Sequence, residues 1–347
     1  MHHKFIIEPL DSGLAEALNN KIDSKTKPQG ALGQLEALAC QIGQIQATLE
    51  PEIRKPKMIV FAADHGIAME GVSAFPQAVT AQMVENFVSG GAAVNVFCRQ
   101  HNLAFEIVDV GVAQLISEEG VVCCKVAAGS NSFLDGDAMT QSQCLQAIDV
   151  GVERVAQAAR DGSNLLAFGE MGIANTASAA ALMAGCLKLD VAQCVGRGTG
   201  LDDQGLQHKT RVLEQALERH RGDFDSLQWL AKVGGFEIAA MVGAFLEAAH
   251  RRMVILVDGF ICSTAALVAS QINPLAKHYM VFCHQSAEQA HQDLLKSMEV
   301  KALLDLSLRL GEGSGAVLAY PLVCSATAFL KEMASFDSAG VSRESEQ

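Results

Sequence analysis

The chain has 347 residues, of which half are hydrophobic and only 5% aromatic, so we expect one large or two modest domains with an aliphatic core. A net charge of −13 disfavours binding to nucleic acid, although backbone N–H groups at a helix start can still hold one phosphate. No signal peptide and no stretch of about 18 uninterrupted apolar residues is apparent, which predicts a cytoplasmic protein outside the membrane.

Short apolar runs alternate along the chain with longer segments rich in Ala and Leu. The runs predict strands at Met58–Ala63, Ala104–Val110, Leu165–Phe168, Val254–Val257 and Tyr279–Cys283. The segments between them predict helices, including Thr176–Cys186, Gln207–Arg219, Glu237–His250 and Ser263–Ser270. This alternation indicates an α/β fold in which helices cover both faces of a doubly wound parallel sheet.

The two ends of the chain have a different pattern. Residues 10–50 and 302–336 look helical, and the second segment is interrupted by glycines at 311–315. The stretch Leu303–Leu310 also has a helix-like pattern. We expect the two ends to pair into a small helical subdomain.

Ten cysteines raise the question of disulfides or metal. No C-x-x-C pair occurs, and most cysteines stand singly in apolar stretches, which predicts buried reduced thiols. Histidines and aspartates near the strand ends match no zinc pattern. We expect these residues to form hydrogen bonds beneath a site rather than to bind metal: Asp64, His65, Asp258, His284 and His291.

Polar or glycine-rich loops follow four of the predicted strands. They are Asp64-His65-Gly66, Gly169–Thr176, Asp258-Gly259-Phe260 and His284–Glu288. Because ligands bind beyond the carboxyl ends of parallel strands, the four loops suggest one shared site.

Two glycine-rich loops are suited to phosphate. In Gly169–Thr176, glycines allow a close backbone approach, and Asn175-Thr176 begin a helix whose N–H groups can face an anion. Gly196–Gly200 is followed by Lys209, which can add a positive charge. Taken alone, the first loop is more often an ordinary turn and Lys209 a solvated surface residue.

Glu312 stands between two glycines and is flanked by apolar segments. Poor solvation would raise its pKa and make it a proton acceptor near neutral pH, although the local context alone favours a glutamate that faces water. No G-x-G-x-x-G opens the first strand–helix unit, and no ATP-binding G-x-x-x-x-G-K-[ST] occurs, which argues against a dinucleotide-dependent oxidoreductase.

Taken together, the ordered motifs resemble one family, the nicotinate-nucleotide–dimethylbenzimidazole phosphoribosyltransferases of cobalamin biosynthesis. The resemblance extends over nearly the whole chain, through Lys27–Gly33, Ala63–Gly66, Gly169–Thr176, Val195–Asp203, Val233–Glu237, Asp258–Phe260, His284–Glu288 and Arg309–Gly315. It implies phosphoribosyl transfer from nicotinate mononucleotide to 5,6-dimethylbenzimidazole or a related base, without a cofactor or metal.

The resemblance also implies the architecture. A Rossmann-like domain would span residues 51–300, and a small helical domain of residues 1–50 and 301–347 would contribute the catalytic glutamate. The family is usually homodimeric.

By the same resemblance, Glu312 is the general base and Glu170 a second catalytic carboxylate. The implied nucleotide-binding residues are Gly172, Asn175, Thr176, Gly198, Lys209, Asp258 and Ser286. The implied base-binding residues are Phe75, Pro76, Gln82, Met83 and Leu310.

Some residues depart from the family pattern. Phe75 and Met83 fall where some members carry polar Ser and Gln, which leaves the preferred base open. An alternative function for the same fold is a non-catalytic nucleotide- or base-binding protein. The intact glycine-rich motif around Glu312 favours catalysis.

Overall fold

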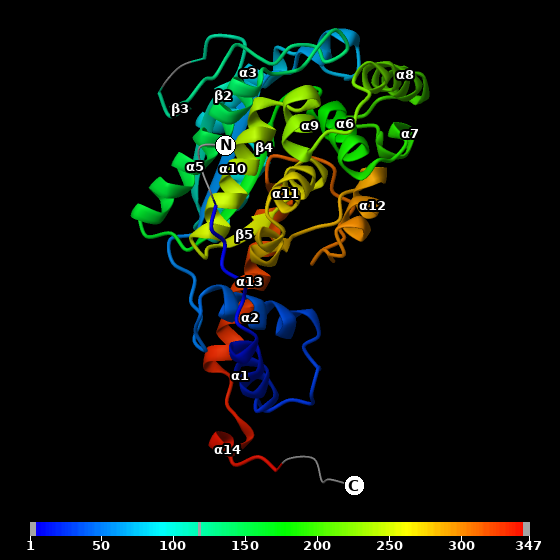
Figure 1. Ribbon diagram of the computed structural model, residues 1–347. Coiled ribbons are helices and arrows are strands. Elements are labelled where there is room, and N and C mark those ends of the chain that lie inside the picture. Colours follow the sequence, from blue (N-terminus) through cyan, green and yellow to red (C-terminus); the bar gives the residue numbers. More distant parts are fainter. Residues whose placement is uncertain (1–4, 117–118, 343–347) are drawn as a thin grey trace.

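The computed structural model describes residues 5–116 and 119–342. Its centre is a six-stranded sheet in the order β3-β2-β1-β4-β5-β6, with every neighbouring pair parallel (Figure 1). The strands are β1 (Lys57–Ala63), β2 (Ala104–Gly111), β3 (Val122–Cys123), β4 (Leu165–Met171), β5 (Val254–Val257) and β6 (Met280–Phe282). The predicted doubly wound α/β fold is confirmed.

The strand order reverses between β1 and β4, where a doubly wound sheet opens a crevice for ligands at its carboxyl edge. The strand β4 is longer than predicted and ends at Met171, so Gly169 and Glu170 belong to the strand rather than to the following loop. Residues 58–63 of β1 are fully buried, as expected for a strand covered on both faces.

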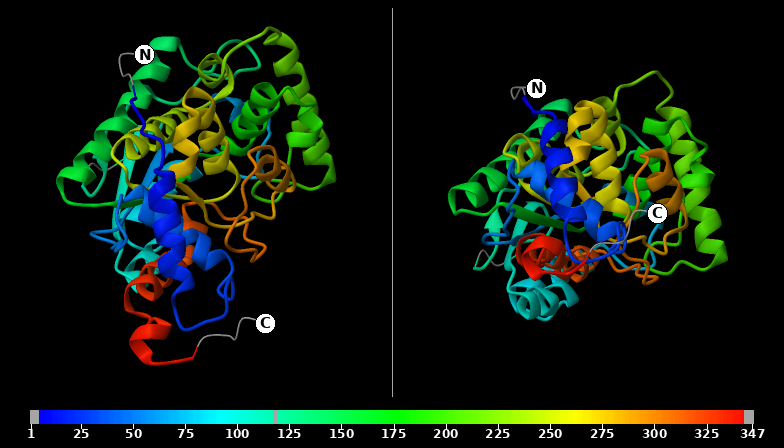
Figure 2. Two further views of the ribbon diagram at one scale, coloured as in Figure 1. Left: turned by 60° about the horizontal axis from the view of Figure 1, so that its bottom comes forward. Right: turned by 90° about the horizontal axis from the view of Figure 1, so that it is seen from below.

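Helices cover the two faces of the sheet, and Figure 2 (right) shows the sheet between the two layers. One layer contains α5 (Gln141–Arg160), α10 (Phe236–His250) and α11 (Phe260–Ile272). The other contains α3 (Val79–Val88), α4 (Ala93–His101) and α13 (Ser314–Glu332). The remaining helices beside the sheet are α6 (Asn175–Leu187), α7 (Val191–Cys194), α8 (Asp203–Arg219), α9 (Ser226–Val233), α12 (Gln289–Ser297) and the 3-10 turns η1 (Gly66–Glu70) and η2 (Pro274–Tyr279).

Helices from the N- and C-terminal regions lie together below the sheet, whereas the segment before the first helix runs up beside α10 (Figure 1). The helix α1 (Ser12–Asp23) packs on α2 (Gln34–Ile45), and α2 packs on α13. A backbone bridge joins Lys25 to Ser335, just before the short helix α14 (Phe336–Ala339). The helices therefore meet as expected, while the domain boundaries at residues 50 and 300 stay a prediction.

The predicted helix at Leu303–Leu310 is wrong. Residues 302–313 contain no helix, and their backbone pairs with the segment that follows β6. The Gln285 N–H donates to the Leu304 carbonyl at 2.8 Å, and the Ala287 N–H donates to the Leu308 carbonyl at the same distance. Apolar leucines were mistaken for a helix because a short apolar run fits either pattern.

The helix α13 is long and apolar enough to cross a membrane by length and composition alone. In the described chain more than half of its most apolar stretch is buried, against α2, α4, β4 and β5 among other elements. Such burial is typical of the core helix of a globular protein.

Candidate active site

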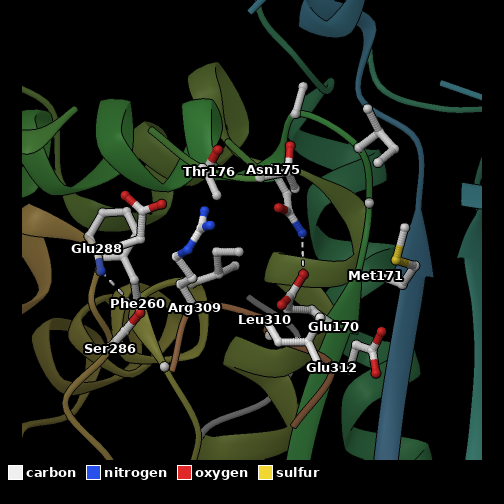
Figure 3. A pocket seen from close by; sticks show the side chains of 18 of the residues that line it. Glu170, Met171, Asn175, Thr176, Phe260, Ser286, Glu288, Arg309, Leu310 and Glu312 are labelled. Atoms are coloured by element: carbon white, nitrogen blue, oxygen red, sulfur yellow. Dashed lines mark hydrogen bonds between the residues drawn. The ribbon is translucent and has the colours of Figure 1, made fainter. Parts of the chain in front are cut away.

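A cavity of about 300 Å³ opens at the carboxyl edge of the sheet (Figure 3). The loops after β4, β5 and β6 contribute to its wall, together with residues from 72–83, 197–199 and 309–312. The loop after β1 contributes no lining residue and instead lies beneath the β4–α6 loop. Three of the four predicted loops therefore share one site.

The β4–α6 loop brings Glu170 and Asn175 together. The Asn175 side-chain amide donates a hydrogen bond to the buried Glu170 carboxylate (Figure 3). Gly172 lies so close to β1 that a side chain there would overlap the Ala63 carbonyl oxygen. Ala174 has a left-handed backbone (φ 75°), which turns the chain into the first residue of α6. These features place the N-terminus of α6 at the cavity, where its N–H groups favour an anion.

Burial raises the pKa of Glu170 well above its ordinary value, and the nearby Glu237 and Asp258 carboxylates raise it further. The hydrogen bonds from Asn175 and from the Glu312 backbone N–H only partly oppose this effect. The raised pKa favours the protonated form of Glu170, which can donate a hydrogen bond through its own O–H.

Lys209, on α8, lies behind the two glycine-rich loops that are suited to phosphate, rather than in the cavity wall. Its Nζ donates to the Thr176 hydroxyl at 2.8 Å and to the Gly196 carbonyl at 3.2 Å. The side chain is fully buried, and burial lowers the pKa of Lys209 to about 8, against the opposing charge of Glu288. Gly198 has a positive φ of 53° and leaves room for both Thr176 and the ammonium. The expectation of a solvated lysine is wrong.

Ser286 lines the cavity and holds the segments around it together. Its hydroxyl donates to the Leu308 carbonyl at 3.2 Å, and its N–H donates to His291 Nδ1 at 2.8 Å. The other ring nitrogen of His291 lies 2.9 Å from the Ser263 hydroxyl. Burial lowers the pKa of His291 to about 3, so its ring is neutral and serves as a hydrogen-bonding support.

Glu312 lines the same cavity and is 6% exposed, so the expectation from local context of a glutamate facing water is wrong. Burial, with a smaller contribution from the charge of Asp258, raises the pKa of Glu312 to about 7, although a hydrogen bond from the Val94 N–H opposes the shift. Its Oε2 is buried and has no hydrogen-bond partner among the described residues. A buried carboxylate with a free oxygen and a near-neutral pKa is suited to accept a proton.

Glycines are needed where the Glu312 loop approaches the sheet. A side chain at Gly169 of β4 would overlap the Glu312 carbonyl oxygen, so the two backbones touch directly. Glu312 itself has a left-handed backbone (φ 65°) between Gly311 (φ 83°) and Gly313 (φ 88°). A non-glycine residue in this conformation carries strain, which is typical of a functional site.

Asp258 fixes the loop from below. Its carboxylate accepts from the Gly313 N–H at 3.2 Å and from the Ala316 N–H at 2.9 Å, and so caps the start of α13. His284 Nε2 lies 3.4 Å from the same carboxylate. Although burial alone would lower the pKa of His284, the hydrogen bond and charge of Asp258 raise it overall. Both Asp258 oxygens are thus engaged in holding the base loop.

The apolar end of the cavity is walled by Val72, Phe75, Val79, Met83 and Leu310. Phe75 is 49% exposed and Leu310 57% exposed, so this end lies at the mouth. Two expected base-binding residues, Pro76 and Gln82, are exposed on the surface and do not line the cavity.

Two arginines in the wall were not predicted from the sequence. Arg197 pairs with Asp203 and donates to the Leu201 carbonyl at 3.0 Å. No hydrogen bond or ion pair within residues 5–116 and 119–342 involves Arg309, whose side chain extends toward Thr176 in Figure 3. The sequence could have indicated Arg309, because it begins the motif Arg309–Gly315 and stands three residues before Glu312.

A metal site is not apparent in the described part of the chain, where no group of three His, Cys, Asp or Glu side chains is arranged to hold an ion. All ten cysteines fall within it and are free thiols. The five residues expected beneath the site are held by their neighbours: four form hydrogen bonds, and His284 pairs with Asp258. The expected position is wrong for Asp258 and His284, which line the cavity.

Comparison with known proteins identifies the family. The profile of a family described as phosphoribosyltransferase matches residues 7–341. The nicotinate-nucleotide–dimethylbenzimidazole phosphoribosyltransferase of Ralstonia nicotianae is 58% identical, over 97% of this chain and 96% of its own. The chain belongs to the nicotinate-nucleotide–dimethylbenzimidazole phosphoribosyltransferase family.

Further members of this family agree. The enzyme of the same name from Dechloromonas aromatica is 57% identical, over 98% of this chain and 99% of its own. The crystal structure of CobT from Thermus thermophilus has a TM-score of 0.92 and 40% identity, covering 96% of this chain and 100% of that one. The family inferred from the ordered motifs is confirmed, and the oxidoreductase alternative is excluded.

Proposed function

We propose that the protein transfers phosphoribose from nicotinate mononucleotide to 5,6-dimethylbenzimidazole or a related base, giving the α-ribazole phosphate used in cobamide lower-ligand assembly. The relatives that match over almost the whole chain carry the name of this enzyme. The observation in the structure that carries the proposal is Glu312, a buried carboxylate with a free oxygen in a cavity that also contains a phosphate-type helix start.

In the proposed reaction one nitrogen of the base attacks the anomeric carbon of the ribose. The bond from that carbon to nicotinate breaks, and its electron pair returns to the pyridine nitrogen. The N–H proton of the base passes to Glu312. Attack from the face opposite nicotinate inverts the anomeric carbon and gives the α product. Because the bound nicotinate is already a pyridinium, it leaves without an acid, and the step balances without a cofactor or metal.

The nucleotide is proposed to bind at the polar end of the cavity. Its phosphate would lie at the start of α6, near Gly172, Asn175 and Thr176, and across from Gly198 and Ser286. Lys209 would supply positive charge from behind Thr176, since an ammonium has three donors and only two are used within the protein.

Two further residues complete this proposed nucleotide site. Arg309 would supply a second cation, since its guanidinium has no partner among the described residues. The protonated form of Glu170, which burial favours, would donate to a ribose hydroxyl. Asp258 supports the site by holding the loop that carries Glu312, and it lies in the cavity wall where the nucleotide would bind.

The base is proposed to lie between Leu310 and the side chains of Phe75 and Met83. This wall is apolar, which suits the carbon ring of a benzimidazole, while Glu312 provides the one carboxylate needed at the N–H edge. Holding both substrates in this geometry supplies much of the rate.

Three broader features belong to the same proposal and rest on the family resemblance: a homodimer, a cytoplasmic location and the two-domain division. Light scattering of the purified protein tests the first, with twice the chain mass expected and a monomer contradicting it.

The direct test mixes the protein with nicotinate mononucleotide and 5,6-dimethylbenzimidazole and follows nicotinate release. We expect release that depends on both substrates. Absence of release with any benzimidazole, purine or phenolic acceptor, together with intact nucleotide binding, would favour the alternative of a non-catalytic binding protein.

A further inference from the structure

Three hydrogen-bonded polar side chains, called the buried triad below, lie beneath the loop Gly172–Thr176 and have no part in the reaction as proposed. His65 follows β1, and its Nε2 is 2.6 Å from Glu237 Oε1 at the start of α10. Its Nδ1 is 2.9 Å from the Ser178 hydroxyl on α6. All three residues are fully buried. The imidazole therefore joins the end of β1 to the beginnings of two helices.

The loop backbone rests directly on this ring. A side chain at Gly172 would come within 3.1 Å of His65 Cδ2, and one at Gly235 would overlap His65 Cε1. Gly172 is also the residue before the turn into α6, whose first residues line the cavity. A displacement of the imidazole would thus move the loop Gly172–Thr176.

Three hydrogen-bonded polar side chains stabilise a core less effectively than apolar side chains would. His65 Nε2 is hydrogen-bonded to Glu237 Oε1, yet the buried Glu237 Oε2 has no partner among the described residues. Replacing a buried ion pair or polar pair by apolar residues is often neutral or stabilising. In addition, Glu237 is the second largest cause, after burial, of the raised pKa of Glu170. A fully buried carboxyl group that keeps an oxygen without a partner among the described residues indicates a role other than stability.

We propose that Glu237, His65 and Ser178 are positioning residues that fix the loop Gly172–Thr176 in the geometry that binds the nucleotide phosphate. This inference rests on the proposed function. It predicts that substitutions which remove hydrogen bonds within the buried triad raise the KM for nicotinate mononucleotide. The KM for the base should stay unchanged, because the base contacts other parts of the cavity wall.

Two variants test the hydrogen bond between His65 and α6 and the need for a carboxylate at position 237. Ser178→Ala removes only the hydroxyl bonded to His65 and should raise the nucleotide KM roughly fivefold, the effect of one ordinary hydrogen bond. Glu237→Gln keeps an oxygen acceptor for His65 and should stay within about twofold of the wild type in nucleotide KM. The matched control Ser270→Ala removes a helix hydroxyl bonded only to its own helix, and its kinetics should be unchanged.

The double variant His65→Leu/Glu237→Met separates positioning from folding, since it removes both polar partners and leaves no unpaired charge. We expect a folded protein, by circular dichroism and thermal unfolding, whose nucleotide KM is raised at least about tenfold. A folded double variant with wild-type constants, or equal rises in both KM values, would overturn the inference.

Equilibrium binding of nicotinate mononucleotide, measured by calorimetry without the base, keeps the inference separate from the proposed reaction. If the wild type binds nucleotide but releases no nicotinate, the reaction fails and the positioning role is still decided by weaker binding in Ser178→Ala. A wild type that binds no nucleotide overturns both.

Discussion

The two ends of the cavity are built in different ways. At the nucleotide end, Glu170, Asn175 and Lys209 come from a central strand and from helices, are buried, and are fixed by hydrogen bonds. Arg309 is the exception at this end, since it is exposed. At the base end, Phe75 and Leu310 come from loops and are about half exposed. Glu312 lies where the ends meet. The contrast indicates that the nucleotide end is rigid and specific, whereas the base end can change its side chains without disturbing the fold.

The largest effect is expected at the junction of the two ends. Glu312→Gln keeps the shape of the side chain but cannot accept the proton, so kcat for nicotinate release should fall by about two to four orders of magnitude. Both KM values should change little. A variant with near-wild-type turnover would remove Glu312 from the mechanism.

Next in size is the cation behind the nucleotide end. Lys209→Met removes the buried ammonium while keeping most of the side-chain volume, and should raise the nucleotide Kd by roughly tenfold to a hundredfold. Lys296→Met, on the surface of α12 beside Asp293, is the matched control and should bind normally. Unchanged affinity in Lys209→Met would refute its role at the phosphate.

The pH profile should show both ends at once. Glu312 must be deprotonated, so activity falls as the pH drops through its pKa of about 7, by up to tenfold per pH unit below it. Lys209 must be protonated, so nucleotide affinity falls as the pH rises through its pKa of about 8. We therefore expect kcat/KM for the nucleotide to be bell-shaped, with its maximum between these values. A flat profile from pH 6 to pH 9 would contradict both assignments.

The smallest effect is expected at the mouth. Phe75→Ala should raise the KM for 5,6-dimethylbenzimidazole several-fold, because a half-exposed ring contributes only part of its burial energy. The nucleotide KM should stay constant. Met69→Ala removes another apolar side chain, which is 78% exposed and outside the cavity wall, and serves as the control. A change in the nucleotide constant would show that the two ends are not independent.

The sequence predicted the central strands and the loops that follow them because buried parallel strands leave continuous apolar runs. It also pointed to Glu312, through the glycines on either side. It could not show that Lys209 is buried, since a lysine on an amphipathic helix looks the same on either face. Burial here depends on how the loop Gly196–Gly200 and Thr176 of α6 pack against Lys209, which the sequence of the helix alone does not show.

Other misses have similar causes. The run Leu303–Leu310 was taken for a helix because its partner, the segment after β6, is recognisable only in three dimensions. The capping role of Asp258 depends on the start of α13, more than fifty residues later in the chain. Long-range pairing of this kind leaves no local pattern.

The route of the chain to Glu312 has a consequence for how the enzyme matures. The helix that follows this residue, α13, lies near the end of the chain, and it is also the surface on which α2 packs. Contacts between α2 and α13 span most of the sequence, and such distant pairings form slowly. Ribosome-bound chains that end before α13 would therefore lack both the docking partner of α2 and the anchored proton acceptor. Catalytic competence thus depends on α13 being in place.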